Sequence, residues 1–392
     1  MSASPELLSL IQEHLHDDVQ QLALQRNRYP QLSDADFRFL LQQIDGFQRT
    51  KDKLPSIAKI EGWWYPVRLS CEQCSSEATA RYKAELISKV DKQISTFIDL
   101  TGGYGVDTYF LSENIQEAHY IERNIELCNI AKHNFQLARP QIQIHNTTAE
   151  EFLLSLSPTT TTECLIYLDP ARRSSSGGKV FRIEDCEPNV INLLPTLRKY
   201  ASTILIKFSP MLDITSAMQS LGNEWDVHIV ALNNEVKEVL FMTGNSNIHA
   251  VNISQSKTDI LSLTRAEEKS AQCTLAENLG TYLYEPNAAI IKAGAFRLIS
   301  ERYKLAKLDT STHLYTNNTL LSDFPGRVWK VQEVISKHST LNPKLKYSII
   351  SRNYPLSPEQ MRKKYKLADG DDYYLIGARY QGKPTLILAQ RL

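Results

Sequence analysis

The chain has 392 residues, of which 42% are hydrophobic, and it contains 44 basic and 44 acidic side chains. This hydrophobic content excludes a largely disordered chain, and no apolar run approaches the ~20 residues needed to span a bilayer. The six cysteines are scattered and the N-terminus lacks a basic, apolar leader. We therefore expect a soluble, reduced, cytoplasmic protein of about two or three domains without a membrane partner.

Charge is unevenly distributed along the chain. Residues 281–392 contain 18 lysines and arginines against 9 acidic residues, a net charge of +9, so residues 1–280 carry −9. A basic module joined to an acidic one favours binding of a polyanion by the C-terminal part. Ordinary surface variation is the alternative.

Residues 1–92 have the pattern of a small helical domain. Apolar residues recur at helical spacing over 4–26. Ser33 begins a second helix with acidic residues in its first turn, and a third helix begins near Ser75. This third helix leads directly into the central strand of the next domain.

Residues 93–245 alternate between strand and helix patterns, which predicts a doubly wound, mostly parallel sheet. The last two strands are separated by too few residues for a crossover helix, so we expect them to pair antiparallel. The expected strands are 96–100, 117–122, 141–145, 163–168, 203–208, 225–232 and 238–243. The expected helices are 106–113, 124–137, 149–155, 188–200 and 211–221.

The pattern changes after the sheet. Residues 246–280 are expected to form a connector that begins with a strand-like run. Residues 281–392 are expected to form a separate α+β module, whose last two strands make a hairpin around Gln381 and Gly382.

The strand at 96–100 carries Asp99 and breaks at once into Gly102, Gly103 and Gly105. A strand, a glycine-rich turn and a helix start form a nucleotide-binding corner, because backbone without side chains can approach a ligand closely. Asp99, at the tip of the strand, can hold an amino group directly or through water.

Acidic side chains also end two later strands. Glu122 ends the second strand, 20 residues after Gly102, where a carboxylate accepts hydrogen bonds from both hydroxyls of a ribose. A solvated glutamate is the alternative. The strand at 163–168 ends in the run Asp169-Pro170-Ala171-Arg172-Arg173.

These motifs resemble those of the class I S-adenosylmethionine-dependent methyltransferases. The run beginning at Asp169 resembles their (D/N)PP(Y/F/R) motif, and DLTGGYG resembles their DxGxGxG motif with Thr101 in place of the first glycine. Glu122 matches their ribose-binding acid, and the antiparallel pair of strands matches their reversed seventh strand. The segments EQCSSEATARYKAEL and YLYEPNAAIIKAGAF resemble the bacterial group that carries a THUMP-like C-terminal domain.

The resemblance covers the chain from about residue 70 to its end and implies a fold. The expected fold is a Rossmann-like, seven-stranded methyltransferase sheet with an antiparallel last strand. A helical N-terminal domain precedes this sheet, and a small α+β THUMP-like domain follows it.

The resemblance also implies S-adenosylmethionine as the cofactor and RNA (tRNA or rRNA) as the substrate, methylated on a base nitrogen. The implied catalytic residues are Asp169, Pro170 and Arg172, with Asp169 either accepting a proton or steering the nucleophile. The implied cofactor-binding residues are Asp99, Thr101, Gly102, Gly103, Gly105, Glu122, Arg123 and Thr148. The family's acid for the adenine amino group is replaced here by Asn146 and the residues after it, so Asn146 or Thr148 would take its place.

Basic side chains are the expected substrate contacts. They come from the loop after Asp169, the end of the strand at 203–208, and a basic run over 362–366. These residues are Arg172, Arg173, Lys179, Lys207, Arg362, Lys363 and Lys364. The alternatives are that the arginines pair with acids such as Glu184 and Asp185, that Lys207 is structural or solvated, and that the basic run is a solvated helix face.

Other functions fit parts of the pattern. A methyltransferase acting on protein or on a small molecule would use the same site, and a non-catalytic protein could bind the cofactor and RNA without transfer. A dehydrogenase fits the glycines and Glu122, but it fits neither the run at Asp169 nor the antiparallel strand.

Cys71 and Cys74 lack a second pair at metal spacing, so we expect no metal. Trp63 and Trp64 are expected to pack in the core.

Overall fold

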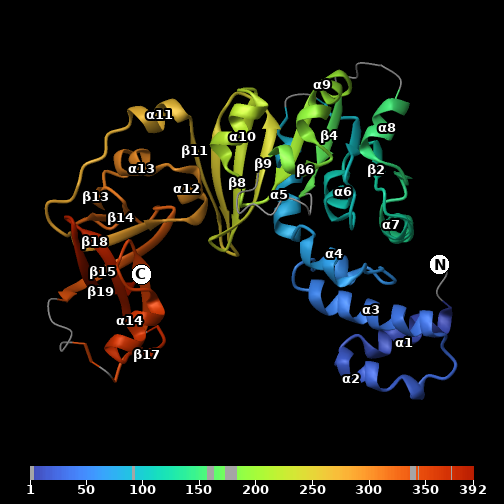
Figure 1. The fold of residues 1–392 in the computed structure, drawn as a ribbon, viewed down its shortest axis with the longest axis horizontal. Coiled ribbons are helices and arrows are strands. Elements are labelled where there is room, and N and C mark those ends of the chain that lie inside the picture. The colour runs from blue at the N-terminus through green and yellow to red at the C-terminus, as the bar shows by residue number, and fades with distance from the viewer. Residues whose placement is uncertain are drawn as a thin grey trace. The chain divides into compact units, whose positions relative to one another are not determined.

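A computed structural model describes residues 4–90, 93–156, 163–172, 183–335, 341–342, 344–371 and 373–392. The chain divides into two compact units. The first unit is Met1–Trp225 with Leu240–Thr243, and the second is Asp226–Val239 with Gly244–Leu392. Figure 1 shows the helices and strands of both units.

Side chains cap the N-termini of most of the helices that begin the first unit. Ser33 caps α3 and Ser76 caps α5, each by accepting a hydrogen bond from a backbone N–H of the first turn. The expected helical stretch 4–26 is divided, because Asp18 accepts from two backbone N–H groups and begins a new helix. The bounds are α1 Pro5–His14, α2 Val19–Leu24, α3 Asp34–Thr50, α4 Arg68–Gln73 and α5 Glu77–Ser88.

Five parallel strands form the core of the first unit, in the order β7-β4-β1-β2-β3. They alternate with helices, as predicted (Figure 1). The strands are β1 Thr96–Asp99, β2 Glu117–Ile121, β3 Ile142–His145, β4 Cys164–Leu168 and β7 Thr203–Phe208. The helices are α6 Val106–Leu111, α7 Ile125–Ala138, α8 Ala149–Ser155, α9 Val190–Tyr200 and α10 Ile214–Leu221. A short pair, β5 Ala171–Arg172 and β6 Cys186–Glu187, lies outside this sheet.

The reversed strand is confirmed. β8 (Trp225–Leu232) and β9 (Glu235–Thr243) are joined only by Asn233 and Asn234, whose φ values are 51° and 68°. Two consecutive residues with positive φ make a type I′ turn, which joins antiparallel neighbours. β9 lies between β7 and β8 in the sheet.

The sheet has nine strands rather than the expected seven, in the order β11-β10-β8-β9-β7-β4-β1-β2-β3. The two added strands, β10 (Ile248–Ile253) and β11 (Thr258–Leu263), come from the stretch expected to be a connector. β10 pairs parallel with β8, and β11 pairs antiparallel with β10. The run at 248–253 forms a strand, as its pattern predicts, but its place beside β8 and the place of β11 at the sheet edge depend on tertiary contacts.

The second unit also contains an eight-stranded sheet, in the order β13-β14-β12-β15-β19-β18-β16-β17. The expected hairpin is confirmed: β18 and β19 pair antiparallel up to Tyr380 and Lys383, around Gln381 and Gly382. The strands are β12 Tyr282–Pro286, β13 Ala306–Asp309, β14 Thr312–Asn317, β15 Gly326–Ile335, β16 Lys346–Arg352, β17 Ala368–Asp369, β18 Tyr373–Tyr380 and β19 Lys383–Arg391. The helices are α11 Arg265–Ser270, α12 Ala288–Ala293, α13 Phe296–Arg302 and α14 Pro358–Tyr365.

Candidate active site

The glycine-rich turn after β1 is shaped by close packing on one side and open space on the other. A Cβ on Gly102 would lie 2.2 Å from the ring of Tyr120, and one on Gly105 would lie 2.8 Å from Phe135. Gly103 has a φ of +55°, and a Cβ there would meet no atom within 4 Å except a carbonyl oxygen of its own turn, 3.7 Å away. The backbone at Gly103 is therefore open to a ligand, as a nucleotide-binding turn requires.

Asp99 lies beneath this turn and is buried. Its Oδ1 accepts a hydrogen bond from the Thr101 N–H (2.9 Å), and its Oδ2 accepts one from the Thr108 hydroxyl (2.6 Å). Burial raises its pKa to about 7, and the charges of Asp107 and Asp169 add to this, against the two hydrogen bonds, which lower it. Asp99 thus holds the turn from inside the protein.

The raised pKa of Asp99 gives a pH-dependent stability. Because the folded protein holds a proton that the unfolded chain releases above pH 3.8, stability falls as the pH rises from about 4 to 7 and is constant above 7. We expect Asp99→Asn, which keeps the shape without the charge, to remove this fall of up to about 4 kcal/mol. Urea unfolding of ligand-free protein at pH 5 and pH 8 measures the part of this fall that lies between these two pH values, about 3 kcal/mol.

The control for this experiment is Asp52→Asn, which changes an exposed aspartate. The difference in unfolding free energy between Asp99→Asn and the wild type should shift in favour of the variant from pH 5 to pH 8. The corresponding difference between the control and the wild type should stay constant. Parallel curves for Asp99→Asn would show that Asp99 does not titrate in this range.

Glu122 lies at the open side of the turn. Its Oε2 accepts a hydrogen bond from the Gly103 N–H (2.9 Å), and its Oε1 accepts one from the Asn124 N–H (2.8 Å). Tyr120, which sequence reasoning did not single out, donates from its hydroxyl to the Gly103 carbonyl oxygen (2.6 Å). The structure thus brings an open backbone and a carboxylate together, which is a donor and acceptor set that fits a nucleoside cofactor.

Arg123 and Thr148 have structural partners. The exposed Arg123 forms an ion pair with Glu187 (2.5 Å), and Thr148 caps α8 by accepting from the Glu151 N–H. Asn146 donates from its side-chain amide to the carbonyl oxygens of Glu122 (2.9 Å) and Arg123 (3.1 Å). Asn146 therefore fixes the segment that carries Glu122.

Asp169 follows β4 and is tied to the glycine-rich turn. Its backbone N–H donates to the Thr101 hydroxyl oxygen at 2.6 Å, and Pro170 beside it is buried. Its carboxylate forms an ion pair with Lys207 of β7. Arg172 lies in β5 and pairs with Cys186 of β6. The side chain of Arg172, together with Arg173 and Lys179, lies outside the described part of the structure.

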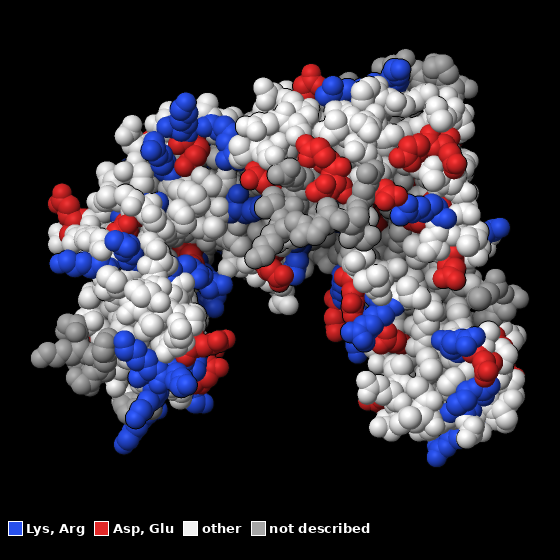
Figure 2. All heavy atoms as spheres, viewed as in Figure 1, with Lys and Arg blue, Asp and Glu red and all other residues white. Residues whose placement is uncertain are grey.

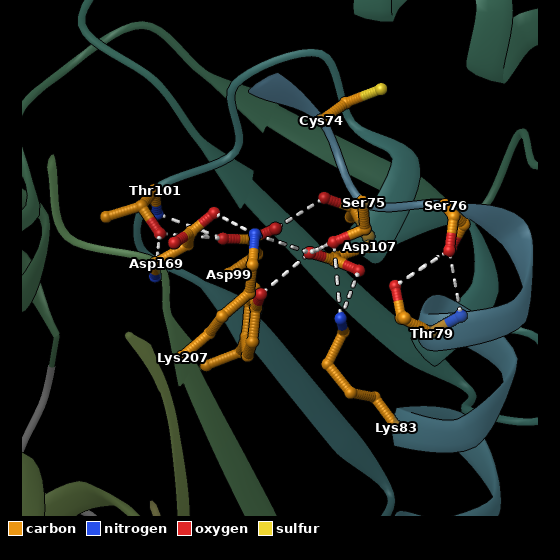
Figure 3. Close-up of polar contacts among 12 residues, drawn as sticks. Cys74, Ser75, Ser76, Thr79, Lys83, Asp99, Thr101, Asp107, Asp169 and Lys207 are labelled. Carbon is orange, nitrogen blue, oxygen red and sulfur yellow. Dashed lines mark hydrogen bonds and ion pairs between the residues drawn. The ribbon is translucent and has the colours of Figure 1, made fainter. Parts of the chain in front are cut away.

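A buried polar cluster lies behind Asp169 (Figure 3). Its centre is Asp107, in the first turn of α6, whose carboxylate accepts hydrogen bonds from the hydroxyls of Ser75 (2.8 Å) and Tyr167 (2.7 Å). The ammonium of Lys83 lies 3.2 Å from Asp107 Oδ1, and that of Lys207 lies 3.8 Å from Oδ2. Burial by itself would raise the pKa of Asp107, but the two ammonium groups and the two hydroxyl hydrogen bonds outweigh burial and hold this pKa below its usual value.

Sequence reasoning missed Lys83, although a signal was present. Lys83 is fully buried in α5, three residues after the buried Ala80 and three before the buried Leu86. A lysine at this spacing lies on the apolar face of an amphipathic helix, where an uncompensated charge is costly. Such a position predicts a buried carboxylate as its partner.

The segment before α4 also contacts the turn. The indole N–H of Trp63 donates to the Tyr104 hydroxyl (2.9 Å), and Trp64 exchanges backbone hydrogen bonds with the side chain of Asn134 (2.8 and 2.9 Å). Both tryptophans are 5% exposed, which confirms packing as their role.

The basic run lies in α14 of the second unit. Arg362 forms an ion pair with Asp369 (2.6 Å), while Lys363 and Lys364 are exposed. Figure 2 shows Lys and Arg side chains gathered over this region, with acidic side chains beside them.

Cys71 and Cys74 are free thiols, and burial raises the pKa of both. Across the described ranges, no group of three or more His, Cys, Asp or Glu side chains could hold a metal ion. Among the same residues, no helix has both the length and the apolar character needed to cross a membrane.

Comparison with known proteins finds family matches in the C-terminal part and a structural match over the whole chain. Residues 282–325 match the family model of a ferredoxin-like domain, and residues 326–391 match that of a THUMP domain-like family. The crystal structure of a candidate methyltransferase from Porphyromonas gingivalis W83 is 32% identical, with a TM-score of 0.86, and the match covers all of this chain and 99% of that one.

Curated relatives match a shorter stretch. Two proteins of Mycobacterium tuberculosis (strains CDC 1551 and H37Rv), each named an uncharacterized S-adenosylmethionine-dependent methyltransferase, are 24% identical over 153 residues. This match covers 38% of this chain and 40% of the length of those relatives.

Proposed function

Since the chain belongs to the class I S-adenosylmethionine-dependent methyltransferases that carry a THUMP-like C-terminal domain, we propose that it methylates RNA at a nitrogen of a base. S-adenosylmethionine is its cofactor, and when bound it supplies an electrophilic methyl group. The residues that would hold the cofactor are those of the turn, Gly102, Gly103 and Gly105, with Glu122 at its open side.

One observation carries the catalytic part of this proposal. The hydrogen bond from the Asp169 N–H to the Thr101 hydroxyl fixes the end of β4 against the cofactor turn. A substrate group held by the Asp169 carboxylate would therefore lie next to the cofactor site, and positioning of this kind supplies much of the acceleration in a displacement reaction.

Asp169 would accept a hydrogen bond from an N–H of the substrate and orient the nitrogen lone pair. Pro170, which is buried, would keep the segment rigid. Arg172, Arg173 and Lys179 would contact the RNA nearby as phosphate or base partners.

The RNA part of the proposal rests on the second unit. Residues 281–392 carry a net charge of +9, residues 326–391 match a THUMP domain-like family, and Lys363 and Lys364 present exposed cations. Cations on one module favour a polyanion by counterion release, so binding should weaken steeply with added salt. We propose that cytoplasmic tRNA or rRNA is this polyanion.

Transfer of tritium from labelled S-adenosylmethionine tests the function. The acceptors are total RNA, total protein and the small-molecule fraction from cells that lack the gene. We expect label in RNA, and digestion to nucleosides would identify a base methylated on nitrogen. Raising the salt concentration should lower RNA methylation at subsaturating RNA, with less effect on cofactor affinity.

Label only in protein or in the small-molecule fraction would contradict the RNA proposal and leave the enzyme class unchanged. Cofactor binding without label in any fraction would favour a non-catalytic, cofactor-binding protein.

A further inference from the structure

Charged side chains of alternating sign run from the core to Asp169 (Figure 3). The order is Lys83 of α5, Asp107 of α6, Lys207 of β7 and Asp169 after β4. Four separate elements thus contribute one charge each, and the last of these charges belongs to the residue proposed to hold the substrate.

The inner part of this array has little access to water. Lys83 is fully buried, and the side chains of Asp107 and Lys207 are only 10% and 11% exposed. Buried charges are stable only when they are paired and hydrogen-bonded. Asp107 meets this condition, since the hydroxyls of Ser75 and Tyr167 donate to it in addition to the two ammonium groups. It is therefore a fixed anchor.

The outer pair is placed by the sheet. β4 and β7 are parallel neighbours whose register joins Leu168 to Ile206, so Asp169 and Lys207 are the next neighbours along the two strands. The side chain of Asp169 is 38% exposed, whereas that of Lys207 is 11% exposed. The side chain of Asp169 is therefore more accessible to a substrate than that of Lys207.

We propose that Lys207 is a positioning residue, whose ammonium is anchored by Asp107 and holds the carboxylate of Asp169 in the orientation that a substrate N–H requires. This inference rests on the proposed function. It gives Lys207 a role through Asp169 in place of the direct substrate contact expected from its position at a strand end.

The ammonium of Lys207 also reduces the repulsion between the carboxylates of Asp107 and Asp169. Asp99, Asp107 and Asp169 lie close enough that the charges of the latter two raise the pKa of Asp99. The ammonium of Lys207 contacts both Asp107 and Asp169. Without it, the carboxylate of Asp169 would be repelled by that of Asp107 and would lose this ammonium partner, so its side chain would turn away.

A mutational square tests the inference with the full-length protein. The variants are Lys207→Met, Asp169→Asn and the double replacement, with Lys199→Met as the matched control, since Lys199 is an exposed lysine of α9. The measured quantities are kcat and KM with the cell fraction that accepts methyl groups from the wild type, and the Kd of S-adenosylmethionine from calorimetry.

We expect Lys207→Met to lower kcat about 10- to 100-fold, with the Kd of the cofactor within about twofold of the wild-type value and no change for Lys199→Met. The double variant should be no slower than Asp169→Asn alone, because residues that act through one another are not additive. A double variant slowed by the product of both single effects would overturn the inference. So would a large rise in the cofactor Kd of Lys207→Met.

Unfolding by urea separates failure of the inference from failure of the proposed function. If no fraction accepts methyl groups, the proposed function fails. The stabilities of the wild type, Lys207→Met, Asp169→Asn and the double variant still measure whether Lys207 and Asp169 are coupled. Lys207→Met should lower the urea midpoint more in the parent than in the Asp169→Asn background, because only the parent also loses the ion pair with Asp169. Equal losses in both backgrounds would show that Lys207 does not act through Asp169.

Discussion

Asp169→Ala should lower the rate of methyl transfer by at least about 100-fold, the range typical of removing a group that acts on the proton or lone pair of a substrate. The carboxylate is the acceptor proposed to orient the target nitrogen, and alanine leaves nothing in its place. Cofactor binding should change little, because the link to the cofactor turn is made by the backbone N–H of residue 169, which alanine retains.

The measurement combines tritium transfer with calorimetric binding of S-adenosylmethionine. Asp52→Ala, which removes an exposed aspartate, is the control and should transfer at the wild-type rate. A folded Asp169→Ala protein that lost cofactor affinity and activity in equal measure would contradict the assigned role. It would place Asp169 in the cofactor site instead.

Lys83→Met should lower the free energy of unfolding by about 3–5 kcal/mol, the usual cost of removing one partner of a buried ion pair. Methionine fills a similar volume, so the loss arises from the charge of Asp107, which stays buried with one cation fewer. Lys207, 3.8 Å from Asp107, would compensate it only in part. Urea unfolding at pH 7 measures the loss.

Two further variants distinguish a loss of charge pairing from a loss of packing. Lys89→Met removes an exposed lysine just after α5 and should change stability by less than about 0.5 kcal/mol. Adding Asp107→Asn to Lys83→Met removes the unpaired charge and keeps an acceptor for Ser75 and Tyr167, so the double variant should be more stable than Lys83→Met. A double variant that is less stable would show that packing, rather than charge, explains the loss.

The parts of the fold that depend on local pattern were predictable from the sequence. The five parallel strands and their helices follow from alternation of strand and helix signals, and the reversed strand follows from the short link at Asn233 and Asn234. The addition of β10 and β11 to the sheet edge was not predictable. Pairing between distant segments depends on register and edge exposure, which local patterns do not encode.

The sequence indicated which residues belong to the candidate site, but it indicated less about how these residues contact one another. The structure brings Gly103 and Glu122 together at the glycine-rich turn, with Asp99 below it, and their binding of a cofactor stays a prediction. The sequence did not predict that Asp99 lies beneath the turn with both oxygens bonded inside the protein. Lys207 appeared as a basic residue at a strand end, and only the register of β4 and β7 shows that its neighbour is Asp169.

The contacts of Trp63 and Trp64 have a consequence for how the first unit unfolds. These residues belong to the N-terminal helical part, yet one bonds Tyr104 in the cofactor turn and the other bonds Asn134 of α7. Loss of the helical part would therefore leave the Tyr104 hydroxyl and the Asn134 side chain without these partners. Because these hydrogen bonds join the helices to the rest of the first unit, we expect the helices and the parallel strands to melt as one cooperative unit.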